Sequence, residues 1–314
     1  MMEQIFTISF FTAFLSAAVR MAIPLFYTAV GETVSERCGI LNMGLEGIMI
    51  CGAYFSFWIT YVTGNHLLGI LAGMAAGMVV SLVHGFISIT LRQNQTVTGI
   101  ALNILCLGLT SYLFKVLVGS SVAFPQIETL PAIAIPVLSR IPLVGEAFFN
   151  KDILTYAAYL LIALLSVFLY RTMWGLTVIS VGENPKAADT VGIHVYVTRY
   201  GAALFNGLMG GLGGAYLMVS QLGLYSEGVT AGRGYIALAI VVFGKRNPLG
   251  VFLAALFFGA ADAVQFRMQA LGVNLPAQLF TGLPYLLTVI ALMGMAKKNT
   301  SPNALTLPYV RSAR

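Results

Sequence analysis

Apolar residues fill most of this chain in long runs that short polar connections separate. A helix of about 20 apolar residues crosses the ~30 Å hydrocarbon core of a membrane. Residues 234–244 are too few for this, which predicts either a longer helix or a half-helix there. The pattern therefore predicts an all-α integral membrane protein with about nine (8–10) transmembrane helices in a single domain, residues 1–314. The predicted helices are 5–30, 39–62, 67–90, 96–118, 153–170, 201–220, 234–244, 248–266 and 279–295.

Composition excludes most other classes of protein. Of the 314 residues, 58% are apolar and 9% are charged, whereas roughly 25% of the residues of a soluble domain are charged. A soluble enzyme, a disordered tail and a disulfide-rich secreted domain are therefore excluded. The cysteines Cys38, Cys51 and Cys106 lie in or beside apolar runs without metal-ligand spacing, which predicts buried packing. We expect no metal and no cofactor.

The net charge of +6 indicates orientation in a membrane rather than affinity for nucleic acid. Cytoplasmic connections of membrane proteins are enriched in Lys and Arg. Alternate connections of this chain hold eleven and four such residues, which places the first set in the cytoplasm, the N-terminus outside and the C-terminus inside. The first set is Arg37, Arg92, Arg171, Lys186, Arg199, Lys245, Arg246, Lys297, Lys298, Arg311 and Arg314, and the second is Arg140, Lys151, Arg233 and Arg267.

Three segments outside the predicted spans stand out. Residues 120–152 contain four prolines among apolar residues and are expected to form an extracellular cap loop. Residues 171–200 form the longest predicted cytoplasmic loop, and residues 296–314 form a cytoplasmic tail. The cap is interpreted either as a passive cover or as a contact for an external partner.

The cytoplasmic loop contains the pattern of a short capped helix. Asn184 suits an N-cap, Pro185 suits the first helical position and Gly192 suits the position after the helix end. Two turns of helix are unstable alone in water. Either the membrane domain or a docked protein must therefore support this segment.

Polar residues near 39–47 predict a discontinuous helix. Asn42 and Gly44 precede Glu46, which opens a strongly apolar run. A carboxylate inside an apolar span is costly, so Glu46 needs a cation or a watery cavity. A helix that starts there would direct free N–H groups at a solute. Two interpretations are open: Glu46 lines the solute route, or it pairs with a buried cation such as Arg20 or Lys115.

Other polar side chains lie within the predicted spans. Asp262 and Gln265 share a helix face, and contacts between helices are the favoured role for both. Thr98 and Asn103 have two equally open roles, since they can bond either a hydroxylated solute or a neighbouring helix. The glycines at 207, 210, 211 and 214 form two small-x-x-x-small pairs, which predict close helix packing.

Three motifs resemble those of a known family. Lys186-Ala187-Ala188-x-x-x-Gly192 is similar to the E-A-A-x-x-x-G motif of ABC importer permeases, with Lys in place of Glu. Ser35-Glu36-Arg37-Cys38-Gly39-Ile40-Leu41-Asn42-Met43-Gly44-Leu45-Glu46-Gly47 is the second match. Ala231-Gly232-Arg233-Gly234-Tyr235-Ile236-Ala237-Leu238-Ala239, continuing through Phe243-Gly244 to Asn247-Pro248-Leu249-Gly250, is the third. Over residues 20–295 the chain resembles branched-chain amino acid, simple-sugar and nucleoside permeases, most of all the nucleoside branch.

The resemblance implies partners and a mechanism. A separate ABC ATPase would hydrolyse ATP, a second permease chain (a homologue or a copy) would complete the route, and an extracellular solute-binding lipoprotein would deliver cargo. The chain would lie in the cytoplasmic membrane of a prokaryote and work by alternating access. The residues implied in ATPase coupling are Glu183, Asn184, Pro185, Lys186, Ala187, Ala188, Asp189 and Gly192. The candidate route residues are Asn42, Gly44, Glu46, Thr98, Asn103, Asp262 and Gln265.

A second class of function is also open. A secondary transporter driven by protons or sodium would use Glu46 and Asp262 as coupling groups. Gradient-driven uptake by the chain alone would favour it. An intramembrane enzyme is disfavoured, because His84 has no Glu or His four residues away.

Overall fold

A computed structural model describes residues 8–118, 125–142, 144–270, 282, 286 and 300–311. Most of this part is helical. The α-helices are α2 (Ile8–Arg37), α3 (Leu45–Thr63), α4 (His66–Gly85), α5 (Gln95–Val118), α6 (Val144–Phe149), α7 (Ile153–Arg171), α8 (Met173–Glu183), α9 (Pro185–Thr190), α10 (Val195–Tyr216), α11 (Arg233–Phe243) and α12 (Pro248–Ala270). The π-helices η1 (Phe86–Thr90) and η3 (Leu217–Leu222) extend α4 and α10.

In the described residues, seven helices are long and apolar enough to cross a membrane: α2, α3, α4 with η1, α5, α7, α10 with η3, and α12. The all-α membrane prediction is therefore confirmed. The predicted first run ended at residue 30, but α2 continues to Arg37. The predicted helix 279–295 lies outside the described residues, apart from Gly282 and Leu286. The predicted run 234–244 corresponds to α11, which is a short helix of 11 residues.

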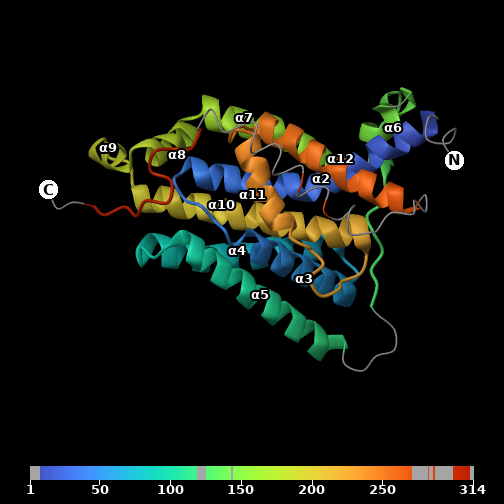
Figure 1. Cartoon of the computed structure of the whole chain (residues 1–314), viewed down its shortest axis with the longest axis horizontal. Coiled ribbons are helices and arrows are strands. Elements are labelled where there is room, and N and C mark those ends of the chain that lie inside the picture. The colour runs from blue at the N-terminus through green and yellow to red at the C-terminus, as the bar shows by residue number, and fades with distance from the viewer. Residues whose placement is uncertain are drawn as a thin grey trace.

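Most of the long helices lie roughly along the long axis of the molecule, with α2, α3 and α10 on the inside, while the short helix α11 runs across it (Figure 1). α10 packs against α2, α3 and α4, α12 packs against α2, and α5 packs mainly against α3. The side chains of α4, α5 and α7 are mostly not buried within the chain. These three helices thus present apolar surface suited to lipid or to another membrane subunit.

Glycines set the closest helix contacts, as the small-x-x-x-small pairs predicted. A Cβ atom at Gly207 would clash with the backbone of Gly77 in α4, and one at Gly211 with Gly73. One turn further along α10, a Cβ atom at Gly214 would clash with the backbone of Met49 in α3. The glycine-rich part of α10 therefore packs backbone to backbone against two helices at once.

The predicted cap contains regular structure. Strands β1 (Ile133–Ala134) and β2 (Asn150–Lys151) form an antiparallel pair, and the 3₁₀ turn η2 (Leu138–Arg140) and α6 lie between them. α6 packs against α2. Lys151 donates from Nζ to the carbonyl and hydroxyl oxygens of Ser16, at 3.0 and 2.6 Å. Burial lowers the pKa of Lys151 to about 8.

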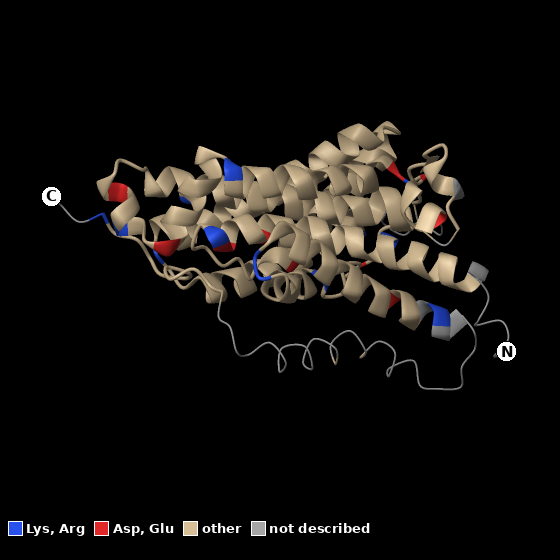
Figure 2. Ribbon diagram, turned by 90° about the horizontal axis from the view of Figure 1, so that it is seen from above, with Lys and Arg blue, Asp and Glu red and all other residues tan. Residues whose placement is uncertain are grey.

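Charged residues are sparse along the helices and lie at both ends of the molecule as well as between them, and one of these ends carries α9 (Figure 2). Several members of the predicted cytoplasmic set meet there or near it. Arg37 donates to the carbonyl of Arg246 at 3.0 Å. Arg92 donates to the Tyr196 hydroxyl at 3.4 Å. The grouping fits the charge count, and the orientation in the membrane stays a prediction.

Candidate solute route and coupling surface

Glu46 stands at the start of α3 and binds the start of α11. Its buried carboxylate accepts hydrogen bonds from the Thr230 hydroxyl at 2.5 Å, the Gly232 N–H at 2.9 Å and the Gly234 N–H at 2.7 Å. Glu46 lies in the first turn of its own helix as well. One negative charge therefore stabilises the positive N-terminal ends of two helices.

The predicted cation partners of Glu46 are engaged elsewhere, so that interpretation is wrong. Arg20 donates to the carbonyls of Ser220 and Gln221, at 2.9 and 2.8 Å. Lys115 pairs with Glu227 at 3.4 Å at an exposed position. Backbone N–H groups at the start of α11 occupy the position where the sequence predicted a cation. They can do so because the first N–H groups of a helix have no partner within it and are free to donate to a carboxylate.

Asn103 in α5 completes the same junction. Its side-chain oxygen accepts from the Gly47 N–H at 2.7 Å, and its amide nitrogen donates to the Met43 carbonyl and the Tyr235 hydroxyl, both at 2.8 Å. In the described residues these atoms bond neighbouring helices, and contact of Asn103 with a solute stays a prediction. Tyr235 was not predicted, and its side chain is 43% exposed beside this buried network.

Asn42, Gly44 and Thr98 also lie near the start of α3. The Asn42 side chain accepts from the Gly44 N–H at 2.9 Å, and a Cβ atom at Gly99 in α5 would clash with Met43 and Gly44. Thr98 donates to the Asn94 carbonyl in its own helix at 2.9 Å. These residues form a turn packed closely on α5. We call Asn42, Gly44, Glu46, Asn103 and Tyr235 the α3–α11 junction.

Asp262 and Gln265 lie on α12, apart from the hydrogen bonds of the junction. Asp262 is buried, and its electrostatic partner is Arg233. Arg233 opens α11 immediately before Gly234 and donates to the carbonyls of Val229 and Thr230, at 3.2 and 3.3 Å. Arg233 therefore bonds the loop that Glu46 binds, and its positive charge acts on Asp262.

Sequence analysis missed two buried carboxylates in α2. Glu32 is fully buried and accepts from the Asn42 N–H at 2.8 Å and from the Asn206 side chain at 2.6 Å. Glu36, one turn later, pairs with the buried Arg246 at 2.5 Å. Their spacing of four residues after an apolar run was the available signal, and the predicted helix end at residue 30 concealed it.

α9 forms as predicted. The Asn184 side chain accepts from the Ala187 N–H at 3.0 Å, Pro185 is the first helical residue, and Gly192 adopts φ +92° after the helix. The helix buries Ala188 against the protein and exposes Ala187. α8, which was not predicted separately, supports α9 from the preceding segment.

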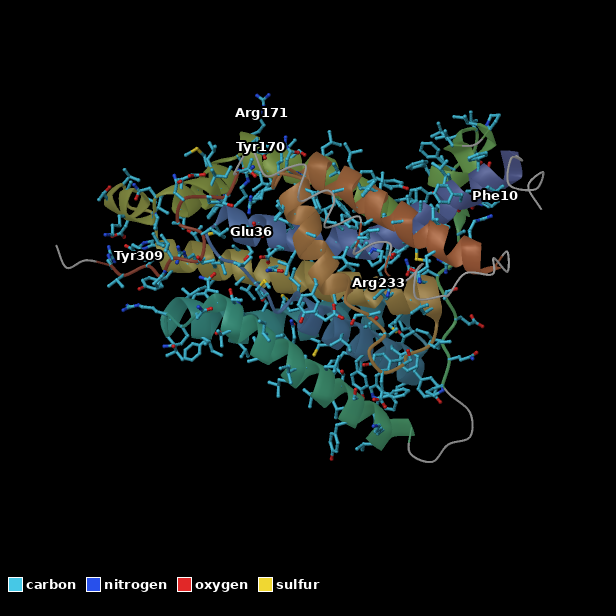
Figure 3. All side chains as sticks on the ribbon, viewed as in Figure 1. Phe10, Glu36, Tyr170, Arg171, Arg233 and Tyr309 are labelled. Atoms are coloured by element: carbon cyan, nitrogen blue, oxygen red, sulfur yellow. The ribbon has the colours of Figure 1, made fainter. Side chains whose placement is uncertain are left out.

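The described C-terminal residues 300–311, here called the strap, lie over the same end. The Thr306 N–H donates to the Gly39 carbonyl at 3.2 Å, and the Ala304 N–H donates to Gly182 at 2.9 Å. Figure 3 shows Tyr309 at the end that carries α9, whereas Glu36 and Arg233 lie among the helices. The strap therefore joins α8 to the turn that leads into α3.

Arg199 holds the middle of the strap. It is buried in α10 and donates to the Leu307 carbonyl at 3.1 Å. The thiol of Cys38 lies near it, and burial raises the pKa of that thiol to about 12. The thiol is therefore neutral at physiological pH, and the Arg199 side chain is stabilised by the strap carbonyl rather than by a carboxylate.

A cavity of about 520 Å³ lies among α2, α7, α8 and α10. Its walls are almost entirely apolar, with Thr177 and Thr198 as the polar exceptions. A polar solute would lose its hydrogen bonds to water there without replacement. This cavity does not suit a polar cargo, and the polar α3–α11 junction remains the candidate site.

A family model described as branched-chain amino acid transport system / permease component matches residues 14–292. The guanosine ABC transporter permease protein NupQ of Bacillus subtilis is 39% identical over 95% of this chain and 96% of its own. The nucleoside ABC transporter permease protein NupC of Lactococcus lactis is 36% identical over 92% of this chain and 94% of its own.

A third similar protein is TsgC13 of Haloferax volcanii, provisionally named a glucose ABC transporter permease protein. It is 39% identical over 96% of both chains. All three relatives are named as permeases, which are transport proteins and not enzymes. No solved structure matches the chain.

Proposed function

Because this chain belongs to the branched-chain amino acid transport system / permease component family, we propose that it carries a nucleoside or a closely related sugar. It is a multi-pass protein of the cell membrane and a permease subunit of an ABC importer, in which a separate subunit hydrolyses ATP. The similarity to the guanosine and nucleoside permeases supports a nucleoside, and the similarity to TsgC13 supports a sugar as the second candidate.

The coupling role belongs to α9. Its capped ends, its exposed Ala187 face and its position at one end of the molecule (Figure 1) support a helix that docks into an ABC ATPase. The residues Glu183, Asn184, Pro185, Lys186, Ala187, Ala188, Asp189 and Gly192 form this coupling segment. ATP-driven closure of the ATPase dimer moves the segment, and the route then opens alternately to each side.

The α3–α11 junction is the observation that carries the proposed route. The Glu46 carboxylate lies at the N-terminal ends of both α3 and α11, so these ends direct partial positive charge into one place. The Tyr235 side chain leads from this network to the surface. We place the solute beside Tyr235, between this chain and a second permease chain, and regard the break near 39–47 as the discontinuous helix expected of a transporter.

Within the junction, Asn42 and Gly44 hold the turn before α3 rather than touch cargo first. Outside it, Thr98 bonds the Asn94 carbonyl at the start of α5, and Asp262 and Gln265 lie on α12, where the charge of Arg233 acts on Asp262. With α11 as a partial span and the predicted helix 279–295 as a further one, the seven spans become nine transmembrane helices. An extracellular solute-binding lipoprotein delivers the cargo over the 120–152 cap.

Reconstitution tests the proposal. Vesicles that contain this chain, its ABC ATPase, its partner permease and its binding protein are supplied with labelled guanosine, ribose or glucose. We expect ATP-dependent accumulation of guanosine in preference to glucose. Accumulation driven by a proton or sodium gradient, with this chain alone, would establish the secondary-transport alternative that uses Glu46 and Asp262.

A further inference from the structure

Apolar side chains of the strap are exposed next to α9. Leu307 is 55% exposed and Val310 is 50% exposed, and Val191, directly after α9, is 76% exposed. Exposed apolar residues at a water-facing end of a protein mark a contact with another molecule when they are contiguous.

Hydrogen bonds fix the backbone of the strap so that these side chains stay outside. Arg199 donates to the Leu307 carbonyl, and the Tyr196 hydroxyl donates to the Tyr309 carbonyl at 3.1 Å. Arg311 then pairs with Asp189 of α9 at 3.3 Å. The strap and α9 are therefore held together as one surface before any partner binds, which lowers the entropy cost of binding.

We propose that Leu307, Val310 and Arg311 form, together with the exposed face of α9, a composite docking surface for the ABC ATPase. The inference rests on the proposed coupling role of α9 and extends it to a second, separate segment of the chain. In this arrangement the ATPase holds the strap as well as the helix.

Position and charge favour the ATPase over the membrane surface as the occupant. α9 and the end of the strap project beyond the ends of α4 and α10 along the long axis (Figure 1). Asp189 is paired with Arg311, and Glu183 accepts from the Asn303 side chain at 3.0 Å. Glu183, Lys186, Asp189 and Arg311 thus balance one another in charge, so this surface has no basic excess that would attract anionic lipid. Its exposed apolar side chains suit an apolar cleft of a protein instead.

Binding of purified proteins tests the surface. The full chain is purified in nanodiscs as wild type and as the double variant Leu307→Asp/Val310→Asp, and its affinity for the separately purified cognate ABC ATPase is measured by biolayer interferometry. We expect binding at least tenfold weaker for the double variant. Val137→Asp is the matched control, because Val137 is 76% exposed in the predicted extracellular cap, and its affinity should equal that of the wild type.

A photo-cross-linking measurement covers the case of a variant that folds poorly. A benzoylphenylalanine residue at position 310 or 191 should form an adduct with the ATPase, and one at position 137 should not. Adducts with phospholipid at position 310 would assign the strap to the membrane and overturn the proposal.

Two outcomes distinguish an error in the composite docking surface from an error in the proposed function. If Ala187→Glu prevents ATPase binding while the double strap variant binds normally, the composite surface is wrong and the coupling helix stands. If the wild-type chain itself binds no ABC ATPase, the proposed function fails with it.

Discussion

The carboxylate of Glu46, in the first turn of α3, accepts the N–H of Gly234, in the first turn of α11, at 2.7 Å. The two residues are 188 positions apart in the sequence. The Glu46 side chain thus lies in the first turn of α3 and caps the N-terminus of α11. The geometry requires glycine at 234, because a Cβ atom there would clash with the Glu46 backbone.

Replacing Glu46 by Gln should destabilise the junction. The amide retains one acceptor oxygen and loses the negative charge, so at least one donor among Thr230, Gly232 and Gly234 is left unpaired. We expect a loss of about 1.5–3 kcal/mol, the typical value of a hydrogen bond to a charged group. Thermal unfolding in detergent measures it. Glu227→Gln, which removes an exposed ion pair, should change stability by less than about 0.5 kcal/mol.

Close packing of α4 on α10 predicts a steric effect. The added Cβ atom of Gly77→Ala would clash with the Gly207 carbonyl and Gly211. We expect a loss of about 1–3 kcal/mol and a reduced yield in size-exclusion chromatography. Gly108→Ala is the control, because no neighbouring atom lies within 4 Å of a Cβ atom there. Equal stability and equal yield of the Gly77→Ala and Gly108→Ala variants would show that α4 and α10 are less closely packed than this.

The buried Glu36–Arg246 pair should tolerate joint replacement better than single replacement. Arg246→Met leaves the Glu36 carboxylate buried without its cation, at a cost of about 3–5 kcal/mol. Glu36→Leu combined with Arg246→Met removes both charges and should cost less. A double-mutant cycle of unfolding free energies measures the coupling. Additive costs would show that the two residues act independently.

Substitution of Ala187 tests α9 as the coupling helix. Ala187 is exposed on α9, so Ala187→Glu should leave the fold intact and reduce co-purification of the ABC ATPase at least tenfold. Ala134→Glu makes the same change at an exposed position of β1 in the cap and should have no effect. Full ATPase recovery with Ala187→Glu would place coupling in another segment.

Because Lys151 is buried, the free energy of unfolding should rise at alkaline pH. Burial lowers its pKa from 10.5 to about 8. Between these values the unfolded chain binds the proton and the folded chain does not, so stability rises with pH from about 8 to 10.5. The gain is up to about 3 kcal/mol, at about 1.4 kcal/mol per pH unit. Thermal unfolding across this range, for the wild type relative to Lys151→Met, should show the increase; parallel curves would show that Lys151 titrates normally.

The elements that the sequence predicted well are those with local causes. Apolar length located the seven spans in the described residues, and the cap residue Asn184 with Pro185 located α9. Local bonding within a few residues decides such features. Small residues at 207, 211 and 214 likewise identified the face of α10 that packs most closely.

Contacts between distant residues explain the errors. The end of α2 was placed too early because Glu32 and Glu36 are polar, yet Asn206 and Arg246 satisfy them across more than 170 positions. Glu46 was assigned a cation because nothing in the local sequence shows that the N-terminus of α11 reaches it. No local pattern marked the strap as a structured segment either.

The Thr306–Gly39 hydrogen bond also constrains the order of assembly. Its donor is synthesised 267 residues after its acceptor, so the Gly39 carbonyl has no partner from the strap until residue 306 has left the ribosome. The Ala304–Gly182 hydrogen bond likewise forms late. Closure of the strap over the end of α8 is therefore a late step of assembly, and a nascent chain that stops before residue 304 lacks both bonds.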